Sequence, residues 1–247
     1  MMSKVEPRQA SARPSIKEIV RAQYPKPHEM PFCFALKNGR FGREEILRSE
    51  IVELYRALGT RGMIQEIYKE KLRAALASGQ MSKDEVENIE EVIDDEGETE
   101  DHIDHLDMRF KLFVGTAVSR KAKLKHDPEL QAINDEWMRV CKDASLFELM
   151  ALMAAIEDWY APVSAFFEDE YRRRGFSDEE LELFIVHKGT DIDHSEAQFE
   201  VLERNRARLD EGKLVRILTR TFNTSRGYDT AKLRLAETKC ALADLVE

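Results

Sequence analysis

Apolar residues along this chain recur at spacings of three and four over long stretches, and the alternation of apolar and polar residues expected of a strand is nearly absent. This period is typical of amphipathic helices. Glycine and proline interrupt the pattern rarely, at 11 and 7 of the 247 residues. The sequence therefore predicts an all-α protein, a bundle of about eight helices in a single domain over residues 15–247, with a loose polar tail at 1–14.

Capping residues, glycines and prolines set the expected helix boundaries. The third expected helix has Gly59 and Gly62 as sites where it can bend, and Asn38-Gly39 suits a left-handed cap at the end of the second. After residue 205 we expect one or two helices, broken near Arg226-Gly227. The helices before that point are expected over 15–22, 32–37, 44–78, 82–95, 98–122, 129–142, 145–174 and 177–205.

Charge and cysteine content narrow the class of protein. The formal net charge is -10, which argues against a nucleic-acid partner because such partners usually require a basic face. No apolar run approaches the roughly 18 residues of a membrane span, and residues 1–14 lack the apolar core of a secretory signal. The three cysteines, Cys33, Cys141 and Cys240, form no close pair, as expected for free thiols in a reducing compartment. The sequence predicts a cytoplasmic protein without a membrane or nucleic-acid partner.

The clearest chemical pattern is His187, Asp191 and His194, at offsets of four and seven residues. At about 100° per residue these offsets place all three side chains within roughly 60° of one helix face. Two imidazoles and a carboxylate on one stripe form a natural half-site for a divalent metal ion. The alternative is a polar surface face that carries two histidines by chance.

A second candidate ligand is Glu157, which lies on a mostly apolar helix face that includes Met150, Met153, Ala154 and Tyr160. Such a face points to the core, and burying an ionised carboxylate is costly unless it is paired or binds a metal. The alternative is a buried salt bridge to an arginine or lysine. Tyr160 and the neighbouring Trp159 are candidates to shape a pocket, or are ordinary core aromatics.

A third group of candidate ligands lies in the acidic, histidine-containing run 94–105. Glu98 and His105 are seven residues apart and share a helix face, which Asp101 also shares. The run holds more acids than one site can use, so most of them are expected to be solvated. No glycine-rich phosphate loop, Gly-x-Ser-x-Gly motif or zinc-type cysteine spacing is present.

Residues 145–162 and 184–194 together resemble the haem-oxygenase-like diiron oxidases and oxygenases, which are related in fold to pyrroloquinoline-quinone synthase and thiaminase II. In that family a glutamate on a long helix precedes His-x-x-x-Asp-x-x-His by about thirty residues, as Glu157 precedes His187. Residues 28–39 resemble the family's opening more weakly, so the similarity spans nearly the whole chain. The resemblance implies a haem-oxygenase-like helical bundle.

The resemblance also implies a metal site. Its ligands would be Glu157, His187, Asp191 and His194, completed by His105 and an acid from the run before it. Glu98 is favoured by spacing, while Glu96, Asp101 and Asp95 remain alternatives, and Glu50 or Glu53 would be a further ligand in some relatives. Metal-free relatives lack such a full ligand set.

The implied cofactors are two Fe(II) ions, with manganese as a second candidate, and dioxygen is the implied co-substrate. The expected activity is that of a non-haem diiron oxidoreductase in the biosynthesis of a specialised metabolite. It would act by N-oxygenation or oxidative C–C cleavage of a small amine- or amino-acid-derived substrate. A homodimer and an external electron donor are compatible with the family. Two alternatives stay open: a metal-independent enzyme of the same fold, similar to thiaminase II or the quinone synthase, and a non-enzymatic helical interaction module.

Overall fold

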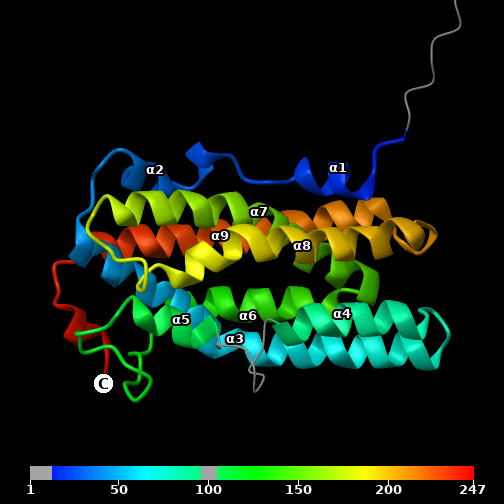
Figure 1. Ribbon diagram of the computed structural model, residues 1–247, viewed down its shortest axis with the longest axis horizontal. Helices are drawn as coiled ribbons and strands as arrows, with labels where there is room; N and C mark the ends of the chain where they lie inside the picture. The colour runs from blue at the N-terminus through cyan, green and yellow to red at the C-terminus, as the bar shows by residue number, and fades with distance from the viewer. Residues whose placement is uncertain (1–12, 96–104) are drawn as a thin grey trace, which may run out of the picture.

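The chain folds into helices, as the apolar period predicts, and the all-α prediction is confirmed (Figure 1). The computed structural model describes residues 13–95 and 105–247, and within them it contains no β-strand, only an isolated bridge between Leu124 and Val246. The α-helices are α1 (Ile16–Arg21), α2 (Pro31–Lys37), α3 (Arg43–Ala77), α4 (Lys83–Asp95), α5 (His105–Lys111), α6 (Pro128–Asp143), α7 (Leu146–Arg172), α8 (Glu182–Arg204) and α9 (Glu211–Glu237). The 3₁₀ helices are Pro27–Glu29, Arg206–Arg208 and Leu242–Leu245.

The long helices lie roughly along one axis, with α3, α4 and α6 on one side, α7, α8 and α9 beside them, and α1 and α2 along the outer face (Figure 1). The most extensive packing is between α7 and α8, and α3 packs on both α6 and α9. Buried residues surround most of α7, as expected of a helix that is apolar on nearly every side. None of the described helices combines the length and the apolar character needed to cross a membrane.

The predicted ends of α7 are confirmed. The backbone N–H of Ser145 donates to the Glu148 carboxylate at 2.8 Å, and the N–H of Glu148 donates to the Ser145 hydroxyl at 3.4 Å. This capping box satisfies donors that the first helical turn leaves open. Gly175 follows the helix at φ 81°, in the left-handed region that glycine adopts at low cost. Pro162 leaves the helix uninterrupted.

Two expected helices differ from the structure. Residues 96–104 lie outside the described part, and over 105–122 the expected helix is present as α5 and ends at Lys111. After α5 the chain turns, because Gly115 takes φ 78° and the Thr116 hydroxyl donates to the Phe113 carbonyl at 2.8 Å. The other is the helix expected over 177–205. Ser177 and Glu180 form a capping box, but the box stabilises a turn, and α8 begins only at Glu182.

The break expected near Arg226-Gly227 is also wrong, because α9 continues through both residues. The glycine serves packing at this position. A Cβ atom added at Gly227 would lie 3.3 Å from Cδ1 of Ile133 on α6, which is a tight contact. Gly227 therefore lets α9 approach α6 closely.

Gly59 has a similar packing role in α3, and this leads to a first testable prediction. A Cβ atom at Gly59 would lie 2.5 Å from Nδ2 of Asn134. The Asn134 amide donates to the Tyr55 carbonyl and accepts from the Tyr228 hydroxyl at 2.7 Å. Gly59→Ala should displace this amide, and we expect a net loss of about 1–3 kcal/mol in unfolding free energy by chemical denaturation.

The matched control is Gly62→Ala, one turn further along the same helix, where an added Cβ atom meets nothing within 4 Å. That substitution should leave stability unchanged or raise it by up to about 1 kcal/mol through helix propensity. Equal effects of the two substitutions would contradict the packing role of Gly59.

Candidate functional site

The stripe predicted on α8 is buried. The exposed fractions are 7% for His187, 2% for Asp191 and 6% for His194. On the opposite side of the helix Ile192 is 46% exposed, so the polar stripe faces inward while an apolar residue faces outward. This reverses the usual distribution on a surface helix, and it disagrees with the alternative that the triplet is a polar surface face.

His187 is held in one tautomer by its own helix. Its Nδ1 atom lies 2.6 Å from the Leu183 carbonyl oxygen, which only accepts hydrogen bonds, so Nδ1 carries the proton. The lone pair is then on Nε2. Metal-binding histidines are commonly oriented in this way by a backbone carbonyl.

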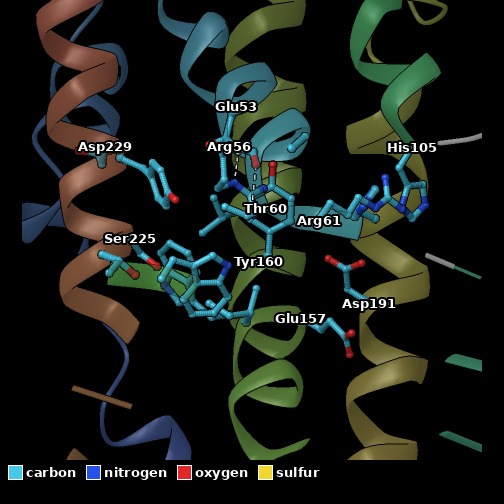
Figure 2. A pocket seen from close by; sticks show the side chains of 18 of the residues that line it. Glu53, Arg56, Thr60, Arg61, His105, Glu157, Tyr160, Asp191, Ser225 and Asp229 are labelled. Carbon is cyan, nitrogen blue, oxygen red and sulfur yellow. Dashed lines mark hydrogen bonds and ion pairs between the residues drawn. The ribbon is translucent and has the colours of Figure 1, made fainter. Parts of the chain in front are cut away.

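Glu157 is 8% exposed and is positioned by a short hydrogen-bonded chain. The Gln198 amide donates to Oε2 of Glu157 at 2.7 Å, and Gln198 Oε1 accepts from the Tyr68 hydroxyl at 3.0 Å. In Figure 2, Glu157 on α7 and Asp191 on α8 both project into the space beside the two helices. The Tyr68–Gln198 pair therefore fixes which way the Glu157 carboxylate points.

His105 joins this group from the start of α5. It is 8% exposed, and its ring centroid lies 4.4 Å from that of His187. Nη2 of Arg61 lies 2.9 Å from Nδ1 of His105 (Figure 2). Because a guanidinium only donates, Nδ1 is the acceptor and the ring proton is on Nε2. In this arrangement His105 offers its lone pair to Arg61, and it would have to release that arginine before it could bind a metal ion.

The described donor side chains suit a metal ion in their chemistry and burial, but not in their spacing. Five buried side chains with oxygen or nitrogen donors come from three helices, and this donor set suits iron or manganese. No three histidine, cysteine, aspartate or glutamate side chains within 13–95 and 105–247 are grouped closely enough to hold an ion. The predicted ligand Glu98 lies outside the described residues, as do the alternatives Glu96 and Asp101 and the side chain of Asp95.

A cavity of about 200 Å³ adjoins these side chains. It extends from His105, His187, Asp191 and Glu157 past Tyr160 to Ser225 and Asp229 on α9 (Figure 2). Its volume is below the roughly 300–1,000 Å³ typical of pockets for drug-sized ligands. Apolar and aromatic side chains form much of the wall: Met30, Ile64, Trp137, Met153, Ile156, Trp159, Val163 and Phe167.

A cluster of buried charges borders the cavity on the side of α3 and α9. Lys232, 3% exposed, donates to Glu50 at 2.9 Å and lies 3.2 Å from Glu53. The Arg56 Nε atom donates to Glu53 at 2.9 Å, and the Tyr171 hydroxyl donates to Glu50 at 2.5 Å. Glu50 and Glu53, the two further candidate ligands, are thus paired with cations.

Opposite charges keep Glu53 and Lys232 of this cluster ionised. Burial by itself would raise the pKa of Glu53, but Lys232, Arg56 and Arg109 outweigh it and hold that pKa below the ordinary range. Burial would likewise lower the pKa of Lys232, but Glu50 and Glu53 raise it. The opposite charges therefore stabilise one another where water does not.

Neither the protein-family models nor the curated proteins searched match this sequence. Function is therefore inferred from the residues of this chain. Sequence reasoning missed Gln198, although it extends the α8 stripe by four residues from His194. It also missed the role of Lys232, because a lysine in an amphipathic helix is expected to face solvent.

Proposed function

We propose that the protein is a non-haem dinuclear metal enzyme, with iron as the metal, that uses dioxygen to oxidise a small organic substrate in the adjoining cavity. The observation that carries this proposal is the burial of His187, Asp191 and His194 on one stripe of α8, beside Glu157 of α7 and His105 of α5. Buried carboxylates and imidazoles in this number are costly to a fold unless they are paired or hold a metal.

The charge of the donor set supports two divalent ions. The sequence-derived set of Glu98, Glu157, Asp191 and three histidines carries about three negative charges, close to the four positive charges of two such ions. Ferrous ions bound there would supply the electrons that reduce dioxygen. Within the described residues the donors are oxygen and nitrogen atoms, which suit iron or manganese.

The protein's own residues prepare the site for this chemistry. The Leu183 carbonyl orients His187, and Gln198 orients Glu157, so neither side chain has to reorganise when a metal binds. The apolar wall next to them limits water, which favours oxidation of a bound substrate over side reactions.

The contact between Arg61 and His105 favours a second candidate function, a metal-independent enzyme of the same fold. An arginine held at 2.9 Å from a ligand histidine places a cation where a metal would otherwise bind. In such an enzyme Arg61, His105 and Glu157 would bind and polarise the substrate directly, through charge and hydrogen bonding.

Anaerobic titration of the purified protein with ferrous iron tests the proposal and separates the two candidates. The dinuclear site predicts uptake of about two iron ions per chain, followed by a transient visible absorption band when dioxygen is added. Absence of specific iron uptake, in a protein with native helical content, would reject the metal enzyme and favour the metal-independent one.

A further inference from the structure

Arg109 is a buried cation whose hydrogen-bonding capacity is not filled. It lies on α5, lines the cavity and is 7% exposed. Within residues 13–95 and 105–247 its Nη1 atom has no hydrogen-bond acceptor, and Oε2 of Glu53 lies 3.8 Å from it. Buried guanidinium groups are normally satisfied. The Nη1 atom is therefore open to a further acceptor.

Tyr160 presents a second donor without a partner to the same cavity. Its hydroxyl oxygen is buried and has no hydrogen-bond partner in the described part of the chain. Burial raises the pKa of Tyr160 and the charge of Arg109 opposes that rise, as expected of a cation close to the hydroxyl. The other five tyrosines all donate to side chains: Tyr24 to Asp158, Tyr55 to Gln131, Tyr68 to Gln198, Tyr171 to Glu50 and Tyr228 to Asn134.

The buried charge cluster next to these donors carries more positive than negative charge. Its cations are Lys232, Arg56 and Arg109. Glu50 and Glu53 supply at most two negative charges in return. An uncompensated charge costs more in such a place than in water, because the effective dielectric constant is lower. One monovalent anion would balance the cluster.

We infer that Arg109 and Tyr160 bind a single inorganic anion of the halide class. The ion would accept from the guanidinium and from the hydroxyl, which are the two donors left open. This inference goes beyond the proposed function and does not rest on it, because both donors belong to the chain itself and need no metal.

Charge and size select a halide among anions. A dianion such as sulfate would be repelled by Glu53, which Lys232, Arg56 and Arg109 keep ionised despite its burial. An organic anion would also have to place its remaining atoms in the cavity, whereas a single-atom ion needs only the two donors. A neutral ligand would leave the excess positive charge in place.

The position of the site gives the ion a structural role. Arg109 comes from α5 and Tyr160 from α7, so the ion would link two helices through groups that otherwise lack partners. Arg109 follows His105 by four residues on one helix face, and the ring of Tyr160 packs edge-on against His187 with the centroids 5.9 Å apart. The bound ion would therefore brace the wall of the cavity beside these two histidines.

The test is iodide binding to the metal-free protein, followed by quenching of intrinsic fluorescence. The chain has two tryptophans, Trp137 and Trp159, and both line the cavity. Potassium iodide replaces potassium gluconate at constant ionic strength. We expect quenching that saturates with iodide concentration and is reversed by chloride. Caesium, a cationic quencher, should give no saturable component.

Substitutions locate the site. Arg109→Gln should weaken iodide about tenfold or more and Tyr160→Phe several-fold, whereas Arg109→Lys keeps the charge and should weaken it less. Tyr228→Phe is the matched control, because it removes a cavity-lining hydroxyl that is already bonded to Asn134. Arg139→Gln controls for loss of a surface charge. Circular dichroism verifies the folding of each variant.

Thermal melting gives a second measurement. Chloride at about ten times its dissociation constant should raise the unfolding midpoint by about 3–6 °C relative to gluconate, and Arg109→Gln should lose this rise. Quenching that is linear in iodide, or iodide affinity unchanged in both Arg109→Gln and Tyr160→Phe, would overturn the site. Displacement of iodide by acetate or sulfate more effectively than by chloride would overturn the halide assignment.

Discussion

Replacing His187 with alanine is expected to abolish tight iron binding. The imidazole is buried, its tautomer is fixed by the Leu183 carbonyl, and its ring packs against those of Tyr160 and His105. Loss of one imidazole from the proposed ligand set should lower the affinity for ferrous iron by far more than the 10–100-fold that follows from disturbing an outer-shell partner. Bound iron per chain after anaerobic gel filtration measures the effect.

His126→Ala is the matched control, because this histidine is exposed and distant in sequence from the candidate ligands. It should retain the iron content of the unmodified protein. Gln198→Leu, which removes the amide that orients Glu157, should give the intermediate loss of about 10–100-fold. If His187→Ala and His126→Ala bind equal amounts of iron, the α8 stripe is not the metal site.

Replacing Lys232 with methionine is expected to cost about 3–5 kcal/mol in unfolding free energy, because it leaves Glu50 and Glu53 buried without their shared cation. Lys232 lies within 2.9 and 3.2 Å of the two carboxylates. Chemical denaturation near neutral pH measures the loss. Lys213→Met is the control on the same helix: its ion pair with Glu148 is partly exposed, and its loss should cost less than about 1 kcal/mol.

The pH dependence of the unfolding free energy shows whether the loss in Lys232→Met is electrostatic. In the native protein the pKa of Glu53 is lowered, so its contribution to stability is present above the unfolded pKa of about 4.3 and is lost as pH falls. The pKa of Lys232 is raised, so its contribution is present below about 10.4 and is lost only at higher pH. The difference in unfolding free energy between the native protein and Lys232→Met should therefore become smaller below about pH 4. A gap that is constant across this range would indicate lost packing instead.

The helical framework could be predicted because local signals decide it. Ser145 and Glu148 cap α7, and Gly175 follows it in a left-handed conformation. The errors arise where tertiary contacts decide. Gly227 in the sequence suggests a helix break, but the helix is continuous there and Gly227 lies against Ile133 of α6. No pattern within α9 indicates that this residue is its neighbour. The turn after α5 depends on Gly115 and the Thr116 hydroxyl. The spacing of apolar residues does not indicate such a turn.

The candidate site divides in the same way. His187, Asp191 and His194 could be found because helical spacing alone puts them on one face. The place of Arg109 in the cavity could not be recognised from the sequence. It depends on the nearby Glu53, whose carboxylate is already paired with Arg56 of α3 and Lys232 of α9. The Arg61–His105 contact likewise joins residues 44 positions apart, a separation at which spacing carries no information.

The α8 stripe also has a consequence for how this chain can change over time. His187, Asp191, His194 and Gln198 are all buried, whereas Lys188, Gly189 and Ile192 are exposed. Substitutions of the exposed Ile192 should be nearly neutral, but one residue inserted or deleted between Leu183 and His187 would rotate every later position by about 100°. All four inward groups would leave the site together. Insertions and deletions in this helix should therefore be tolerated less well than most substitutions. Homologous chains should differ in α8 by residue replacement and not by insertion.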